Sequence, residues 1–207
     1  MDKAKDGAIE LFFVDASHFV TGGFVGIIWS KIRRFVRTSS GRARYNVLGT
    51  LNFATKRVET ITNDSYITSI QVMELLDKLV INYPCKIIKV ILDNASYQRC
   101  KAVKNYAQGL NIELIFLPTY SPNLNLIERF WKYVKSEVLN AAYHSTFQEF
   151  KDVIDNCIWQ ADKANISKMN SLITDKVQLF DHILSHNNST AQSDAQPCEK
   201  HFLPFAA

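Results

Sequence analysis

Short runs of β-branched and aromatic residues alternate along the chain with stretches of helical periodicity. The runs are of strand length and end at Pro, Gly, Asn or Asp, which favours strands over buried helices. Strands are predicted near residues 9–14, 24–29, 44–53, 87–92 and 112–117. Helices are predicted between Asp64 and Tyr83, at 96–108, in a segment with Glu128 in its first turns, and at 146–162.

The order of these elements predicts an α/β fold. The first three strands are expected to form an antiparallel meander, with a basic turn at Ser39-Ser40-Gly41. Helices and strands then alternate, which favours parallel pairing. We therefore expect a mixed five-stranded sheet flanked by helices, in which the first and fourth strands lie side by side.

The apolar positions of each predicted helix define the face that we expect to be buried. One stripe precedes Tyr83, a second follows the Pro- and Asn-rich segment before Glu128, and a third runs through 146–162. Their members are Ile67, Ile70, Met73, Leu76, Leu79 and Val80 in the first, Leu124, Ile127, Trp131, Val134 and Val138 in the second, and Phe150, Val153, Ile154, Cys157 and Ile158 in the third.

Three acidic residues stand where these elements end or begin. Asp15 follows the first apolar run, Asp93 follows the fourth, and Glu128 lies in the first turns of a helix. Adjacent first and fourth strands would bring the two Asp residues to one sheet edge, within reach of the Glu. Each acid also has an ordinary explanation, because Asp favours turns and Asn125 with Glu128 fits a capping box.

Length and composition limit the alternatives. A chain of 207 residues with 47% hydrophobic content can bury one good core. No apolar run approaches the roughly 18 residues that span a bilayer, and no signal peptide is recognisable, so we expect a cytoplasmic, nucleoid-associated protein without a membrane partner. The four cysteines show neither metal-site nor disulfide spacing and are interpreted as free thiols.

Positive charge is concentrated in one part of the chain. Between Asp15 and Glu59 there is no acidic residue, although the net charge of the whole chain is only +4. Such a segment next to a candidate carboxylate site indicates a polyanion such as DNA, but a solvated arginine-rich hairpin has the same composition. The candidate DNA-binding residues are Lys31, Arg33, Arg34, Arg37, Arg42, Arg44, Arg129, Lys132 and Lys135.

Three motifs give the chain a family likeness. They are Phe13-Val14-Asp15-Ala16-Ser17-His18-Phe19, Leu92-Asp93-Asn94-Ala95, and the long block from Leu117 to Lys132, which contains Tyr120-Ser121-Pro122 and Leu124-Asn125 before Ile127-Glu128-Arg129. Together they resemble the catalytic domain of mariner-superfamily transposases of the bacterial insertion-sequence branch. The 34 residues between Asp93 and Glu128 match the separation associated with that superfamily.

The resemblance implies a ribonuclease H-like fold and a DDE triad of Asp15, Asp93 and Glu128. The triad would bind two Mg²⁺ ions, with Mn²⁺ as a substitute, for DNA hydrolysis at the element's ends and strand transfer of the freed 3′-hydroxyl. Asn94, His18 and Asn125 are expected to have supporting roles. Relatives act as dimers on double-stranded DNA, so we expect a homodimer.

Two departures from the family accompany the likeness. Many relatives have Glu after the first Asp and His five positions after the second, where this chain has Ala16 and Gln98. Relatives also carry an N-terminal helix-turn-helix region, so we expect a partner half of that kind encoded upstream. The expected organisation is a lead-in at 1–8, the catalytic domain at 9–165, a helical extension at 166–184 and a disordered tail at 185–207.

Two other functions remain open from the residues alone. Another ribonuclease H-like nuclease, acting on Holliday junctions or RNA–DNA hybrids, would also use carboxylates at a sheet edge. A DNA-binding or regulatory remnant without catalytic activity would retain the same motifs for a time.

Overall fold

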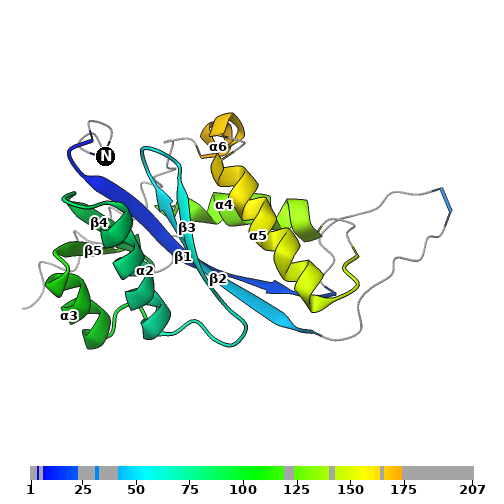
Figure 1. The fold of residues 1–207 in the computed structure, drawn as a ribbon, viewed down its shortest axis with the longest axis horizontal. Coiled ribbons are helices and arrows are strands. Elements are labelled where there is room, and N and C mark those ends of the chain that lie inside the picture. Colours follow the sequence, from blue (N-terminus) through cyan, green and yellow to red (C-terminus); the bar gives the residue numbers. More distant parts are fainter. Residues whose placement is uncertain are drawn as a thin grey trace, which may run out of the picture. The chain divides into compact units, whose positions relative to one another are not determined.

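A computed structural model describes residues 4, 7–22, 31–32, 42–118, 124–139, 143–163 and 166–173, which lie within one compact unit (Figure 1). The strands are β1 (Glu10–Val20), β2 (Arg44–Asn52), β3 (Val58–Asn63), β4 (Ile88–Leu92) and β5 (Ile112–Phe116). The helices are α2 (Ser69–Asn82), α3 (Lys101–Gly109), α4 (Ile127–Leu139), α5 (Phe147–Lys163) and α6 (Ile166–Leu172).

The strands form one mixed sheet in the order β3-β2-β1-β4-β5. The pairs β1–β2 and β2–β3 are antiparallel, whereas β1–β4 and β4–β5 are parallel. The predicted five-stranded mixed sheet and the adjacency of its first and fourth strands in the chain's order are therefore confirmed.

Two details of the meander differ from the prediction. Strand β1 continues to Val20, so Asp15 lies within a strand and does not follow its end. The third strand of the meander is β3, which was not predicted although Val58 to Thr62 is rich in β-branched residues. The strand predicted near 24–29 and the turn at Ser39-Ser40-Gly41 lie outside the described residues.

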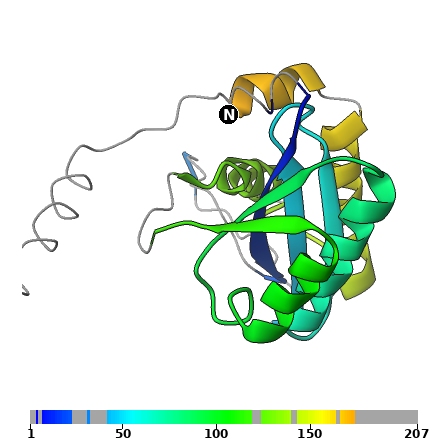
Figure 2. The same ribbon diagram turned by 90° about the vertical axis from the view of Figure 1, so that its left-hand side faces the viewer.

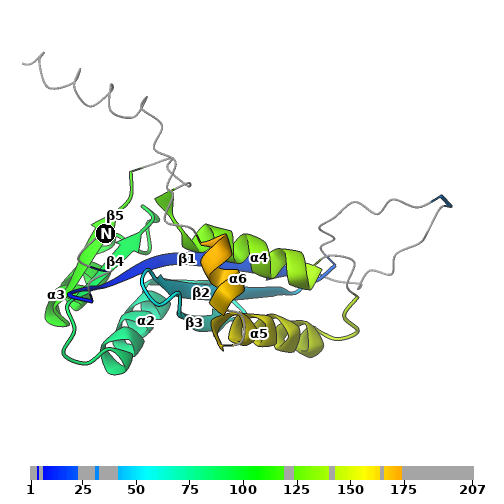
Figure 3. The ribbon, with the colours of Figure 1, turned by 90° about the horizontal axis from the view of Figure 1, so that it is seen from above.

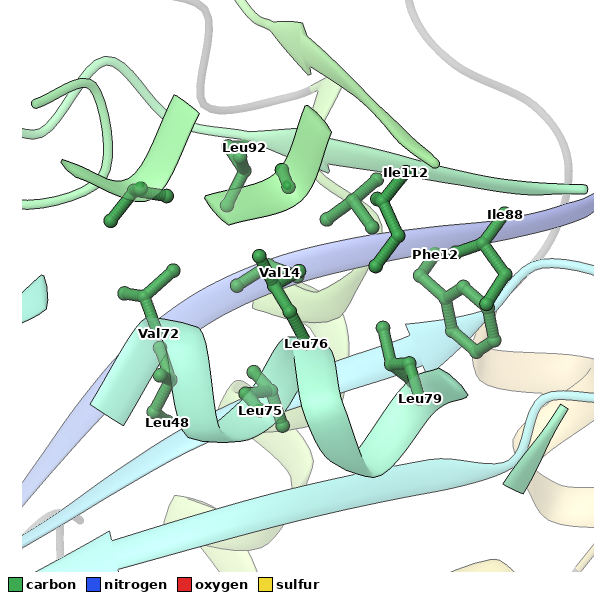
Figure 4. Packing of buried hydrophobic residues seen from close by; sticks show 13 residues of the cluster. Phe12, Val14, Leu48, Val72, Leu75, Leu76, Leu79, Ile88, Leu92 and Ile112 are labelled. Carbon is green, nitrogen blue, oxygen red and sulfur yellow. The ribbon is translucent and has the colours of Figure 1, made fainter. Parts of the chain in front are cut away.

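One face of the sheet packs against α2 and α3 (Figures 2 and 4). Even-numbered residues of β1, such as Phe12 and Val14, point to this face because side chains alternate along a strand. Helix α2 starts at a capping box between Thr68 and Gln71. The core cluster on this side consists of Phe12, Val14, Leu48, Val72, Leu75, Leu76, Leu79, Ile88, Val90, Leu92, Val103, Ala107 and Ile112.

The opposite face of the sheet lies under α4, with α5 packed beside it (Figure 3). Odd-numbered residues of β1 point this way, and the Phe19 ring meets Trp131 of α4 edge-to-face at 6.4 Å. On the same side, the Tyr45 hydroxyl of β2 donates to Asp155 of α5 at 2.9 Å. Asp15 therefore belongs to the α4 face of the sheet.

The predicted helix faces are right in part. In α2 the buried residues are Val72, Leu75, Leu76 and Leu79. Ile70 is 64% exposed because it lies two residues before Val72, on nearly the opposite side of the helix. Val153 of α5 is also exposed, while Ala161 is buried. Helix α3 begins at Lys101, later than the predicted Ser96. Within the described residues no helix is long and apolar enough to cross a membrane.

Candidate active site

Asp15 and Asp93 meet at the edge where β4 ends. The last parallel pair between β1 and β4 joins Val14 to Leu92, so the two Asp residues are the next position on each strand. Strand β4 ends at this point, whereas β1 continues along β2. Parallel strands that stop at different lengths thus bring together two carboxylates that are far apart in sequence.

Asn125, which precedes α4, holds β1 and the end of β4 in place near the two Asp residues. Its side chain is 2% exposed, and its amide donates to the Val14 carbonyl and to Asp93 Oδ1, each at 3.1 Å. Its own Oδ1 is buried and has no hydrogen-bond partner, so it does not cap the helix. The capping-box interpretation of Asn125 and Glu128 is therefore wrong: the Asn side chain holds a carboxylate against the sheet.

Glu128 stands in the first turn of α4, between the buried residues Ile127 and Phe130. Its side chain is partly exposed, and its backbone N–H donates to the Asn125 carbonyl at 3.2 Å. Burial raises the pKa of Glu128, the charge of Asp93 raises it further, and Lys132 one turn later lowers it. The third acid is thus close enough to Asp93 for their charges to interact.

The pKa of Asp15 is set by its burial and by the charged groups around it. Burial raises the pKa of Asp15 to about 7, with further increases from the charges of Asp93 and Glu128. The Ala16 N–H, which donates to Asp15 Oδ1 at 2.7 Å, and the ammonium group of Lys135 act in the opposite direction. The carboxylate is therefore costly to ionise at this position, and a bound cation would remove that cost.

Tyr97 and Gln98 line the same region and were not singled out as site residues from sequence. Burial raises the pKa of the Tyr97 phenol to about 12, and the charges of Asp15 and Asp93 contribute to this rise. Gln98, which stands where many relatives have His, is 1% exposed and hydrogen-bonds Tyr97. Its Oε1 is buried without a partner. Gln98 is thus a buried residue that contacts Tyr97 next to the site.

One predicted supporting residue, His18, lies away from the acids. His18 points to the α2 face by strand alternation, and its Nδ1 pairs with Oδ1 of the buried Asn46 at 2.6 Å. Ala16 packs on the same α2 face. The structure therefore does not bring His18 to the carboxylates. Asn94 follows Asp93 directly and is exposed.

The basic candidates divide into two groups. On α4, Lys132 is exposed and Lys135 lies 5.8 Å from the centroid of the Phe19 ring, with Arg129 partly buried in the same helix. Lys31, Arg42 and Arg44 are exposed, while Arg33, Arg34 and Arg37 lie outside the described residues. Positive charge therefore flanks the carboxylates along α4.

The donor atoms suit a hard divalent cation. Carboxylate oxygens are ligands that Mg²⁺ and Mn²⁺ prefer, and the unpartnered Oδ1 of Asn125 adds a neutral oxygen beside Asp93. In the described part of the chain, no three His, Cys, Asp or Glu side chains are near enough to hold an ion as they stand.

Residues 10–151 match the family model described as DDE superfamily endonuclease. The chain belongs to this family. The match includes Asp15, Asp93 and Glu128 and confirms the DDE endonuclease domain expected from the motifs, so the domain is that of a nuclease. Among curated proteins, none matches the sequence.

Solved structures share the fold of this DDE domain. A pre-cleavage Mos1 transpososome matches with a TM-score of 0.57 and 11% identity, over 86% of this chain and 58% of that one. A mariner Mos1 paired-end complex with Mg matches with a TM-score of 0.52 and 16% identity, over 80% of this chain and 53% of that one. A simian T-cell lymphotropic virus intasome, in complex with PP2A regulatory subunit B56 gamma, matches with a TM-score of 0.53 and 13% identity. This match covers 97% of this chain and 62% of that one.

These likenesses concern the fold, since the identities are low. They confirm the ribonuclease H-like architecture predicted for the sheet. The chain spans 53–62% of the length of these three chains.

Proposed function

We propose that this DDE domain cleaves DNA phosphodiester bonds and transfers the freed 3′-hydroxyl to target DNA, as a transposase of the mariner type. The observation that supports this most is the corner formed by Asp15 and Asp93, with Asn125 bonded to Asp93 and Glu128 coupled to it by charge. Three carboxylates on three separate elements are more than turns and caps require.

Asp15, Asp93 and Glu128 are the proposed ligands of two Mg²⁺ ions, with Mn²⁺ as a substitute. When bound, the ions lower the pKa of an attacking water and neutralise the departing oxygen of the phosphodiester. The protein's own contribution is to hold and orient the ligands. Asn125 keeps the Asp93 carboxylate at the end of β4, and the neighbouring lysines of α4 offer positive charge to the flanking phosphates.

The substrate we propose is double-stranded DNA, and the basic segment and α4 lysines support this choice. The Mos1 neighbours are a transpososome and a paired-end complex, which supports action on DNA. We also propose a homodimer on DNA, a helix-turn-helix partner half and a nucleoid location in the cytoplasm. We propose 9–165 as the catalytic domain, followed by a helical extension at 166–184 and a tail at 185–207. The family match at 10–151 supports the first of these three parts.

The test is metal-dependent cleavage of plasmid DNA by the purified chain, alone and with the helix-turn-helix half supplied. We expect nicking with Mg²⁺ or Mn²⁺ and a loss of at least 10³-fold in Asp93→Asn, because a neutral amide cannot replace a ligand carboxylate. Asp77→Asn is the matched control, since Asp77 is bonded to Tyr106 on the α2–α3 side. Cleavage without metal, or full activity in Asp93→Asn, would contradict the assignment.

A further inference from the structure

Gly49 lies directly opposite Asp15 in the antiparallel ladder between β1 and β2. Directly paired residues share a face of the sheet, so the Gly49 position points toward α4, as Asp15 does. Glycine weakens the interior of a strand unless another group must approach closely. Its φ lies outside the left-handed region, so the backbone does not demand glycine here.

Glycine is required here because a neighbouring side chain comes too close for a Cβ atom. A Cβ at residue 49 would lie 2.6 Å from Cζ2 and 2.8 Å from Cη2 of Trp131, and 3.4 Å from Cδ1 of Ile127. Carbon atoms attract one another best at about 3.5–4.0 Å, so an added methyl group would force the ring or the helix away by about 1 Å. The indole of Trp131 therefore occupies the room that a side chain at position 49 would need.

The two side chains over Gly49 bracket Glu128 in sequence. Ile127 and Trp131 are four residues apart and share one face of α4, and both are buried, at 0% and 3% exposure. Glu128 projects from the same turn beside them. The depth at which Ile127 and Trp131 settle on β2 consequently sets the height of the Glu128 carboxylate above Asp15 and Asp93.

Packing holds Trp131 in this place. Its ring meets Phe19 edge-to-face at 6.4 Å and Phe130 at 5.1 Å, while its Nε1 is buried without a hydrogen-bond partner. A side chain fixed by shape and by no hydrogen bond responds directly to any volume added beneath it. It also tolerates replacement by a smaller ring better than a hydrogen-bonded indole does.

We propose that Gly49 is a positioning residue for metal binding. By carrying no side chain opposite Asp15, it lets Trp131 seat α4 on the sheet at the height that brings Glu128 to the two aspartates. The inference rests on the proposed metal-dependent function of the triad. Strand β2 supplies none of the acids, but in this proposal it sets the position of the third ligand, Glu128.

The decisive experiment is a double-mutant cycle between Gly49→Ala and Trp131→Phe. Gly49→Ala should raise the Mn²⁺ concentration for half-saturation at least tenfold and lower DNA cleavage on the order of 10²-fold, as a 1 Å misplacement does, with an unchanged far-ultraviolet circular dichroism spectrum. Trp131→Phe removes the atoms that clash. The double variant should bind Mn²⁺ and cleave DNA better than Gly49→Ala does.

Gly109→Ala is the matched control, because a Cβ there meets nothing within 4 Å, and it should leave both readouts unchanged. Gly49→Ala with wild-type Mn²⁺ affinity overturns the positioning role. So does a double variant that restores neither readout, including one that does not fold. Failure of the wild-type chain itself to bind Mn²⁺ would contradict the proposed function, which separates the two results.

Discussion

The amide of Asn125 donates to Asp93 and to the carbonyl of Val14, and so ties the end of β4, the backbone of β1 and the start of α4 together. A polar side chain that is 2% exposed is stabilising only while both bonds are made. This arrangement makes Asn125 the joint between the sheet and the helix that carries Glu128.

Asn125→Ala is expected to lower the free energy of unfolding by about 1–3 kcal/mol, because two buried hydrogen bonds are lost, one of them to a carboxylate. Urea denaturation measures the change. Asn105→Ala, at an exposed position of α3, is the matched control and should change stability by less than about 0.5 kcal/mol. Equal stability of the two variants would show that the Asn125 bonds contribute nothing.

The raised pKa of Asp15 predicts an unusual pH dependence for the metal-free chain. Between the ordinary value of 3.8 and about 7, the folded protein keeps a proton that the unfolded chain has lost. The free energy of unfolding should therefore fall as pH rises through this window, by about 1.4 kcal/mol for each unit of pKa difference at most. Glu128, whose pKa is also raised, acts in the same direction.

Asp15→Asn checks this assignment. With chelator present, the variant should be more stable than the wild type at pH 7.5 and should show a flatter stability profile between pH 4 and 7, since it has no carboxylate to ionise there. Denaturant titrations at several pH values give both quantities. An identical slope in the two proteins would place the pH dependence elsewhere.

The lysines of α4 should contribute to DNA binding through phosphates. Lys132→Ala with Lys135→Ala is expected to weaken binding similarly for all sequences and to reduce the slope of log K against log salt by about 1 for each lysine that contacts a phosphate. Fluorescence anisotropy at several salt concentrations measures the slope. Lys101→Ala with Lys104→Ala on α3, across the sheet, should leave it unchanged; a loss in both pairs would mean general charge attraction.

Sequence patterns predicted the fold well where the order of the elements limits the possible strand neighbours. Apolar runs ending at Asp15 and Asp93 led to the right strand neighbours, because a meander followed by helix–strand units allows few arrangements. The pattern could not show that β1 continues past Asp15, since the extension is held by pairing with β2 alone.

Other features depended on three-dimensional contacts. Alternation along a strand places His18 on the face opposite Asp15, and this becomes certain only when the strand is known to continue. The role of Gly49 needed the distance to Trp131, which no local pattern contains. By contrast, β3 was foreseeable, because Val58 to Thr62 has the β-branched composition typical of a strand.

The central claim is that Asp15, Asp93 and Glu128 together bind divalent cations. Calorimetric titration of Mn²⁺ into the chain near pH 6.5, in buffers of different ionisation enthalpy, tests it most directly. The account predicts binding coupled to release of a proton, because Asp15, with a pKa of about 7, must ionise to become a ligand. It also predicts loss of binding in Asp93→Asn. Binding of equal affinity in that variant, or no proton release, would contradict it.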